Sequence, residues 1–584
     1  MKKDIILFLV LLIFISGIAT GGALFYKNYY MPNEEVVNPY DNADTVLVIE
    51  GDEILEEHPP RIVEGQILLP FETVKGHIDP YIWWDETLKK VTVTTKDRVI
   101  RMETDNLDAL INSEPMELKF PATEFDGVLY IPIDFLAPFY RINIKYAMET
   151  NVVIIDREDV IHRIGYPTSV NAVIRRGRHI RYPIIKKFQD GDLASDAAKL
   201  YIYEDYDEWY KVRTAGGILG YIQKEHVVIK AFEINQIPES LKKTPKLPGG
   251  KINLVWDQMY NPTKKYLQWE KSDGIDVLSP TWFQIANADG DLINRADPQY
   301  VEWAHNNGYQ VWALVANEFN NIDNTSAILN DGLKREHVIK QILAFAALYQ
   351  LDGINIDFEN IYKNDKNAFT QFMRELTPFL REQKLAVSVD VTIPDGSDTW
   401  SKCYDRKALA ETVDYVCLMT YDQTWAGSKV AGSTAQLVWV EENLKKTLRE
   451  VPQEKLLLGI PLYTRLWGEK TDDYGNKIEA TVGNALSIEA ASRLIAENEA
   501  VPVWDEESGQ YTVSFEKDNV VYKMWLEDEY SVNQKSALAH KYNLAGTSTW
   551  SHNFANDKVW TVFAENLKNI SHYEEWRTKN LANR

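Results

Sequence analysis

Three polar side chains alternate with apolar ones in the stretch LDGINIDFEN, residues 351–360. In a β-strand, successive side chains point to opposite faces, so Asn355, Asp357 and Glu359 share one face and the apolar residues share the other. Burying two carboxyl groups side by side is costly unless they are paired or protonated. The pattern therefore favours acid–base chemistry over a purely structural role.

The elements that would position these groups begin near residue 252, where short apolar runs alternate with helical patterns. There are eight runs: INLVW (252–256), IDVLSP (275–280), YQVWALV (309–315), GINIDFE (353–359), LAVSVDV (385–391), VDYVCLMTY (413–421), LLLGIPLY (456–463) and LAGTSTW (544–550). Residues 366–384 place apolar side chains on one stripe at helical spacing, which predicts a helix packed on the strands.

Eight β/α units predict an α/β fold, a (β/α)8 TIM barrel, with a small α+β insertion between strands 7 and 8. The active site of such a barrel lies at the carboxyl ends of its strands. On a barrel strand the polar face of residues 353–359 points into the barrel, and Glu359 reaches the mouth.

Several of these segments resemble one family. DGINIDFE is similar to the D-G-x-D-x-D-x-E strand of glycoside hydrolase family 18, the chitinase-like barrels. MTYDQ (419–423), GIPLYTRLW (459–467) and GTSTWSHNFAND (546–557) resemble the family's segments at strands six, seven and eight, in the same order. The resemblance implies a catalytic glycosidase barrel over residues 252–570.

The resemblance implies a role for each matching residue. Glu359 would protonate the glycosidic oxygen, with its pKa raised by a semi-buried site. Asp357 would orient a 2-acetamido group of the substrate, and Tyr421 would donate its hydroxyl to that group's carbonyl oxygen as an oxazolinium-like intermediate forms. Trp550 would stack beneath the sugar. The substrate would supply its own nucleophile, and the configuration would be retained.

Further residues at predicted strand ends are expected to bind substrate: Met419, Asp422, Asn355, Trp282 and Asn317. Asp422 equally suits a structural cap, and aromatic residues at such positions equally suit packing between strand and helix. No His, Cys, Asp and Glu set has the spacing of a metal site, so we expect no metal and no cofactor.

The sequence departs from the chitinase pattern at two places. Asn355 stands where the family has an aspartate, and VWALVANEF (311–319) lacks a Ser-x-Gly-Gly segment. These departures resemble the family branch that acts on bacterial cell-wall or spore-cortex glycan. The favoured function is therefore cleavage of peptidoglycan or cortex containing β-linked N-acetylglucosamine. A chitinase or chitooligosaccharide hydrolase, or a catalytically silent glycan-binding lectin, remains the alternative.

Residues 1–30 are expected to form a membrane anchor or a cleaved signal segment. Lys2 and Lys3 precede roughly 21 mostly apolar residues, a length that can cross a bilayer. The positive-inside rule keeps these lysines cytoplasmic. The expected location is the cell membrane, with one N-terminal span and an extracytoplasmic catalytic domain, or secretion if the segment is cleaved.

Two smaller modules precede the barrel. Residues 42–158 contain an internal echo, EGQILLP (64–70) and DGVLYIP (126–132), and resemble the copper-amine-oxidase-like stalk domain of bacterial surface proteins. Residues 165–232 include DEWYKVRTAGGILGYIQ (207–223) and resemble a bacterial SH3-like domain, which implies a cell-wall partner. The aromatic cluster of Trp209, Tyr210 and Tyr221 could equally form the core of this domain. Residues 233–251 are expected to be a linker.

Composition agrees with a multidomain protein that binds sugars. The chain has 584 residues, with 17 Trp and 31 Tyr able to stack on flat ligands. Its 86 acidic and 63 basic residues give a net charge of −23, which disfavours nucleic acid as a partner. Whether the two cysteines, Cys403 and Cys417, pair with each other is left open.

Overall fold

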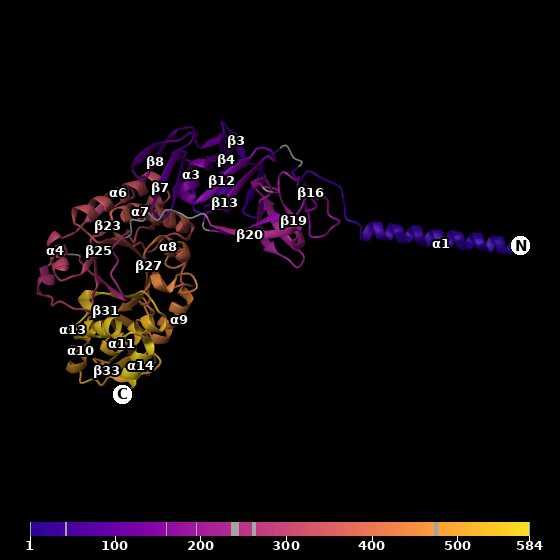
Figure 1. Cartoon of the computed structure of the whole chain (residues 1–584). Helices are drawn as coiled ribbons and strands as arrows, with labels where there is room; N and C mark the ends of the chain where they lie inside the picture. The colour runs from indigo at the N-terminus through magenta and orange to yellow at the C-terminus, as the bar shows by residue number, and fades with distance from the viewer. Residues whose placement is uncertain are drawn as a thin grey trace. The chain divides into compact units, whose positions relative to one another are not determined.

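The computed structural model of the protein forms two compact units, Met1–Val93 with Ile100–Leu241, and Thr94–Val99 with Lys242–Arg584 (Figure 1). The described residues are 2–40, 44–158, 160–193, 195–234, 245–259, 264–471 and 477–582. Most of the predicted linker, residues 233–251, lies outside them.

Helix α1 (Lys2–Tyr29) covers the segment predicted to be a membrane anchor. No helix among the described residues is long and apolar enough to cross a membrane. Within α1 the side chains of residues 2–7, 9, 10, 28 and 29 lie outside the described set. The described residues therefore do not support the predicted anchor.

The first module of unit 1 is built from three small sheets, with strand orders β12-β13-β1-β2, β10-β11-β4-β3 and β5-β6-β7-β8-β9. Its elements are β1 (Val46–Ile49), β2 (Asp52–Ile54), β3 (Arg61–Val63), β4 (Gln66–Pro70), α2 (Phe71–His77), β5 (Trp83–Asp85), β6 (Lys90–Thr94), β7 (Val99–Glu103), β8 (Asp108–Ile111), β9 (Glu114–Glu117), β10 (Thr123–Phe125), β11 (Val128–Pro132), α3 (Ile133–Tyr140), β12 (Ile142–Ala147) and β13 (Val152–Arg157). Strands β4 and β11 each end in a proline that leads into a short helix, and they pair antiparallel, with Leu69 opposite Ile131. The predicted internal echo is therefore confirmed as two matching strand–helix units.

The second module of unit 1 is one antiparallel sheet with the order β16-β15-β19-β18-β17-β14-β20. Its strands are β14 (Ile161–Pro167), β15 (Val173–Arg175), β16 (Ile184–Lys187), β17 (Leu200–Asp205), β18 (Trp209–Thr214), β19 (Leu219–Gln223) and β20 (Val227–Ile234). Trp209 is buried, whereas Tyr206 and Tyr221 are half-buried and lie 6.1 Å apart between ring centres. Of the three aromatic residues in the predicted cluster, Trp209 is therefore core, Tyr210 is half-buried and packs against the core, and Tyr221 is half-buried.

Unit 2 is a closed barrel of eight parallel strands, as predicted. Around the barrel, the strands follow the spatial order β22-β21-β35-β29-β28-β27-β26-β25, and pairing of β22 with β25 closes the barrel. The strands are β21 (Ile252–Asp257), β22 (Val277–Pro280), β25 (Gln310–Ala316), β26 (Gly353–Asp357), β27 (Ala386–Thr392), β28 (Tyr415–Met419), β29 (Leu456–Pro461) and β35 (Gly546–Trp550). A hairpin, β23 (Phe283–Ile285) and β24 (Leu292–Asn294), extends from β25.

Helices surround these strands (Figure 1). They are α4 (Pro298–Asn306), α5 (Ile322–Leu329), α6 (Gly332–Leu348), α7 (Lys366–Glu382), α8 (Arg406–Thr412), α9 (Leu437–Thr447), α11 (Glu529–Ser536), α12 (Leu538–Lys541), α13 (Asp557–Ala564) and α14 (Tyr573–Ala582). The helix predicted over 366–384 is α7, and its Phe369 and Phe372 stack on Phe358 with ring centres 5.7 and 5.4 Å away. The apolar face of residues 353–359 thus packs on the helix layer, which leaves the polar face for the barrel interior.

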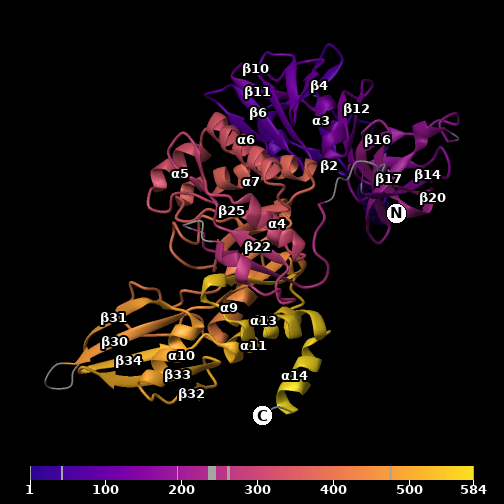
Figure 2. The ribbon, with the colours of Figure 1, turned by 90° about the vertical axis from the view of Figure 1, so that its left-hand side faces the viewer.

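An insertion lies between strands β29 and β35, where the sequence predicts it. It consists of β30 (Thr464–Thr471), β31 (Lys477–Leu486), α10 (Ile488–Glu497), β32 (Val503–Asp505), β33 (Gln510–Lys517) and β34 (Val520–Trp525). Figure 2 shows this antiparallel sheet with α10 beside it, extending away from the barrel strands. Glu527 ties it to the barrel, because this buried carboxyl accepts hydrogen bonds from Gln510 (2.9 Å) and from Lys535 of α11 (2.6 Å).

Replacing Gly546 with alanine should destabilise the barrel. Gly546 has a φ of +154°, and an added Cβ would lie 1.9 Å from the backbone oxygen of Ile252. The paired backbones of β21 and β35 would have to separate, and overpacking of this kind costs about 3 kcal/mol. We expect a lower midpoint of thermal unfolding. Gly249→Ala is the matched control, since its Cβ would meet nothing within 4 Å. Equal midpoints for the two variants would contradict the prediction.

Candidate active site

Strand β26 delivers the predicted acidic residues to the mouth of the barrel. Asn355 and Asp357 are buried on its inner face, and Glu359 follows two residues after the strand ends, half-buried. Asp357 is 7% exposed, and its Oδ1 has no hydrogen-bond partner among the described residues. The sequence-predicted pair of carboxyls is thus brought to the carboxyl end of one barrel strand.

The backbone at Glu359 is held by side chains from neighbouring loops. Asn317, which follows β25, accepts the Glu359 N–H at 2.9 Å and donates to its carbonyl oxygen at 2.7 Å. The Tyr404 hydroxyl donates to the carbonyl oxygen of Phe358 at 2.8 Å. These bonds fix the main chain on both sides of the Cα of Glu359, so its carboxyl group starts from a defined position.

Burial and neighbouring carboxyls keep protons on this site. Burial raises the pKa of Glu359 well above its usual range, and the charges of Asp357, Asp390 and Asp422 raise it further. Burial raises the pKa of Asp357 to about 7. Glu359 therefore keeps its proton to a higher pH than an exposed glutamate does, which suits a general acid.

The loop after β28 supplies the second side of the site. Burial raises the pKa of Tyr421 well above its usual range, so its hydroxyl stays protonated and can donate a hydrogen bond. The next residue, Asp422, accepts hydrogen bonds from the Tyr463 hydroxyl at 2.5 Å and from the Arg465 guanidinium at 2.7 Å. Arg465 was not predicted as a site residue, although it lies within the quoted segment GIPLYTRLW.

Strand β35 ends at Trp550, the predicted stacking residue. Its side chain is half-buried, and its ring centre lies 6.0 Å from that of Trp256 on the adjacent strand β21. Met419, the last residue of β28, is 8% exposed. Both residues therefore lie at carboxyl ends of barrel strands, where the sequence places them.

Three residues predicted to bind substrate have side chains without solvent exposure. Asn355, Trp282 and Asn317 are each 0% exposed. Trp282 packs edge-on against Tyr300, with ring centres 5.3 Å apart, and Asn317 binds the Glu359 backbone as described above. The structure does not support direct substrate contact for these three side chains, because each is enclosed by neighbouring elements.

Asn355 instead organises the barrel interior. Its Oδ1 accepts from Trp256 Nε1 at 2.9 Å and from Ser279 Oγ at 3.3 Å. Its Nδ2 donates to Ser388 Oγ at 2.9 Å and to Asp390 Oδ1 at 2.8 Å. Asp390 is a functional candidate that sequence reasoning missed; a single aspartate in the apolar run LAVSVDV was its only signal.

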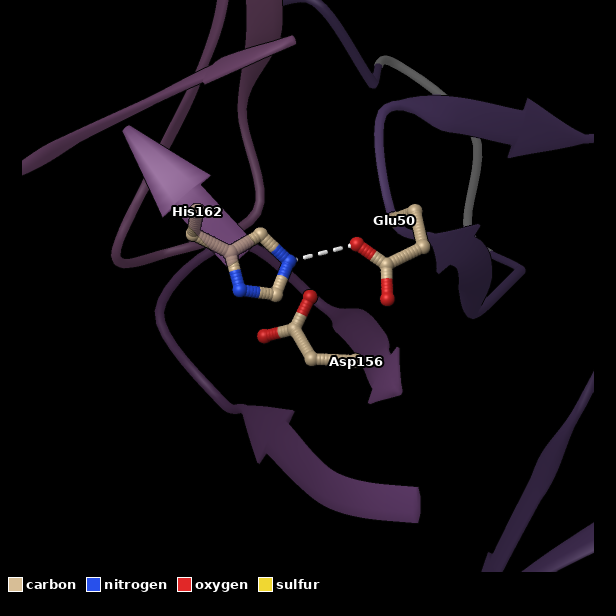
Figure 3. Close-up of side chains that lie close together, drawn as sticks. All are labelled: Glu50, Asp156 and His162. Carbon is tan, nitrogen blue, oxygen red and sulfur yellow. Dashed lines mark hydrogen bonds and ion pairs between the residues drawn. The ribbon is translucent and has the colours of Figure 1, made fainter. Parts of the chain in front are cut away.

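One group of ligand-type side chains among the described residues is close enough to surround a metal ion, and it lies in unit 1 rather than in the barrel. It consists of Glu50, Asp156 and His162 (Figure 3). His162 Nε2 is 2.6 Å from Glu50, and Arg213 donates to both oxygens of Asp156 at 2.7 and 2.8 Å. The buried Arg213 guanidinium already supplies the positive charge that a metal ion would bring, so we interpret this group as an ion-pair network joining the two modules of unit 1.

The sequence matches two known families. Residues 260–555 match the family described as glycosyl hydrolases family 18. Residues 48–155 match the copper amine oxidase N-terminal domain, which confirms the resemblance expected for the first module. The SH3-like character of residues 165–232 stays a prediction.

Individual relatives fall on the barrel. The uncharacterized glycosylase YvbX of Bacillus subtilis is 25% identical over 318 residues, which are 53% of this chain and 88% of YvbX. The cortical fragment-lytic enzyme of Bacillus subtilis is 26% identical over 246 residues, 41% of this chain and 55% of that enzyme, so the chain spans about half of its length.

A solved C-terminal domain from Desulfitobacterium hafniense superimposes with a TM-score of 0.50 at 24% identity and covers 55% of this chain and all of that domain. This likeness supports the barrel fold. Because the match to glycosyl hydrolases family 18 covers half of the chain and coincides with the barrel that carries Glu359, the chain belongs to this family and is a glycosidase.

Proposed function

We propose that the protein is a retaining, substrate-assisted glycosidase that cleaves β-linked N-acetylglucosamine in bacterial peptidoglycan or spore cortex. The observation that carries this proposal is the half-buried Glu359 at the barrel mouth, whose pKa burial raises, with Asp357 two residues earlier at the end of β26 and Tyr421 on the loop after β28. An acid, an acceptor for an amide N–H and a neutral hydroxyl donor are the groups that such a reaction needs.

In the first step, Glu359 gives its proton to the glycosidic oxygen, and the bond from that oxygen to C1 breaks. The carbonyl oxygen of the substrate's own 2-acetamido group forms a bond to C1 on the opposite face, which produces an oxazolinium ion. Asp357 accepts the amide N–H, for which its unpartnered Oδ1 is suited, and Tyr421 donates to the acetamido oxygen. In the second step, Glu359 takes a proton from water, the water oxygen bonds to C1, and the acetamido group is released with the configuration retained.

The arrangement of the carboxyls favours the acetamido group over a protein nucleophile. Retaining glycosidases with a carboxylate nucleophile place two carboxyls across the scissile bond, about 5–5.5 Å apart. Asp357 and Glu359 instead follow each other along one chain segment, where alternate Cα atoms are about 6–7 Å apart. Since Asp357 lies deeper in the barrel than Glu359, it is suited to support the substrate from below.

The choice of glycan follows from one relative and one residue. A relative named cortical fragment-lytic enzyme and the asparagine at position 355 favour wall or cortex glycan. Chitin oligomers are the alternative substrate. A lectin without activity is the alternative function, but a glycan-binding site has no use for a proton donor such as Glu359.

The variant Glu359→Gln should lose glycosidase activity. The amide has the same shape but carries no transferable proton, and a general acid contributes about 10²–10⁴-fold in rate. Product release should be measured on purified peptidoglycan, spore cortex and chitin oligomers, with the exposed Glu497→Gln in helix α10 as control. Equal rates for Glu359→Gln and the control would remove the assigned role. Faster turnover of chitin than of both wall glycans would replace the proposed substrate.

Substrates without the acetamido group should resist cleavage. In the proposed reaction this group is the nucleophile, so its loss removes the first step while leaving the acid in place. Hydrolysis of fully N-acetylated and N-deacetylated oligomers of equal length should be compared, and the deacetylated ones should react at least about 100-fold more slowly. Comparable rates would exclude substrate assistance.

We further propose that the enzyme acts outside the cytoplasmic membrane and that its second module binds wall glycan through Tyr206 and Tyr221. The Arg178 guanidinium lies over one face of the Tyr206 ring, 4.0 Å from the ring centre, so a sugar would have to stack on the other face. Full-length Glu359→Gln protein should sediment with purified wall, and adding Tyr206→Ala should weaken this binding, whereas adding Phe232→Ala should not. Binding unaffected by Tyr206→Ala, or a cytoplasmic location on cell fractionation, would argue against this part of the proposal.

A further inference from the structure

A second carboxyl group lies inside the barrel beside the proposed catalytic residues. Asp390, on strand β27, is 1% exposed. Among the described residues no lysine or arginine forms an ion pair with Asp390 or with Asp357. Burial raises the pKa of Asp390 well above its usual range, and the charge of Asp357 raises it further. Two buried carboxyls that influence each other in this way titrate as a pair.

The orientation of the Asn355 amide shows how Asp390 is held. An indole N–H can only donate, so the atom that faces Trp256 Nε1 must be the amide oxygen of Asn355. The amide NH2 group must then face Ser388 and Asp390, and it donates to Asp390 Oδ1 at 2.8 Å. All four hydrogen-bonding sites of Asn355 are filled, which fixes the Asp390 carboxyl against strand β26.

We propose that Asp390 is a positioning residue of the reaction: it forms a carboxyl pair with Asp357 and thereby sets the pH range in which Glu359 holds its proton. The inference rests on the proposed acid role of Glu359. Strand β26 has an amide, Asn355, in place of a second carboxyl next to Asp357. Strand β27 supplies that carboxyl as Asp390.

The groups around Asp390 favour this role. Asp357 follows Ile356, the register partner of Val389, so it lies beside Asp390 on the adjacent strand β26. The Cys417 thiol, the register partner of Asp390 on β28, donates to it. Its charge also acts on Glu359 and Tyr421 at the mouth. The donors from Asn355 and Cys417 favour the charged form of Asp390, while burial opposes it. When Asp390 carries the negative charge, Asp357 and Glu359 bind their protons more tightly, because like charges repel in a medium of low dielectric constant.

A neutral hydrogen-bond acceptor at position 390 would bind the Asn355 amide equally well. A charge effect of Asp390 can therefore be distinguished from a purely structural role. In Asp390→Asn the new amide oxygen can still accept from Asn355 Nδ2, so this hydrogen bond is kept while the negative charge is lost. A structural role predicts a small effect on activity at every pH. The proposed role predicts a change in the pH dependence.

The test compares pH profiles of kcat/KM for the full-length protein and its variants. Asp390→Asn should move the alkaline limb to lower pH by about one unit, which is about a tenfold loss on that limb, with KM nearly unchanged. Asn355→Asp adds a buried acid and should move the limb the opposite way. The double variant Asn355→Asp/Asp390→Asn returns one carboxyl to the pair and should restore a profile close to that of the wild type.

The control is Asp414→Asn, which removes a carboxyl at the opposite end of β27 and β28, where Asp414 accepts the Val387 N–H at 2.9 Å. It should leave the pH profile in place. The proposal would be overturned if the alkaline limbs of the Asp390→Asn and Asn355→Asp profiles both coincided with that of the wild type. An equal shift of the alkaline limb in Asp414→Asn would also overturn it. If Asp390→Asn does not fold, the Asn355→Asp profile decides alone. Loss of the proposed function itself would be recognised separately, as full activity of Glu359→Gln.

Discussion

Three acidic side chains, Asp357, Asp390 and Glu359, share the interior and mouth of a closed barrel in which neither aspartate is paired with a basic residue among those described. In water each would lose its proton well below pH 7. Inside the barrel, burial raises the pKa of all three, and the charge of Asp357 raises the pKa of Glu359 and of Asp390 further. The chemistry assigned to this protein depends on that constraint, because an ionised Glu359 could not protonate a leaving group.

The barrel makes this constraint possible by fixing where the carboxyls lie. Gly546 allows β35 to approach β21 closely enough to close the cylinder, and closure keeps water from the inner faces of the strands. Asn317 and Tyr404 then hold the backbone on either side of Glu359. Without such bonds the carboxyl could turn toward solvent, and its pKa would return toward the ordinary value.

Much of this arrangement could be predicted from the sequence, because it depends on local patterns. Alternation within LDGINIDFEN gave the inner face of β26, and the eight apolar runs gave the barrel strands. What the sequence does not show depends on contacts between distant segments. Trp282 and Asn317 stand at strand ends, yet neighbouring helices and loops bury them. Asp390 looked like one polar residue in an apolar strand, and only the pairing of β26 with β27 brings it to Asn355.

The positive charge near the site lies away from the buried carboxyls. Arg465 is bound to Asp422 at the outer edge, 2.7 Å away, and so does not neutralise the carboxyls deeper in the barrel. A guanidinium beside Asp357 or Asp390 would favour their ionised forms and lower the proton affinity of the pair. The Arg465–Asp422 ion pair therefore stays at the rim, and the buried carboxyls of Asp357 and Asp390 keep their raised pKa values. Since a general acid and an acceptor for an amide N–H must act within a few ångströms of each other, this separation lets two carboxyls from one chain segment perform different tasks.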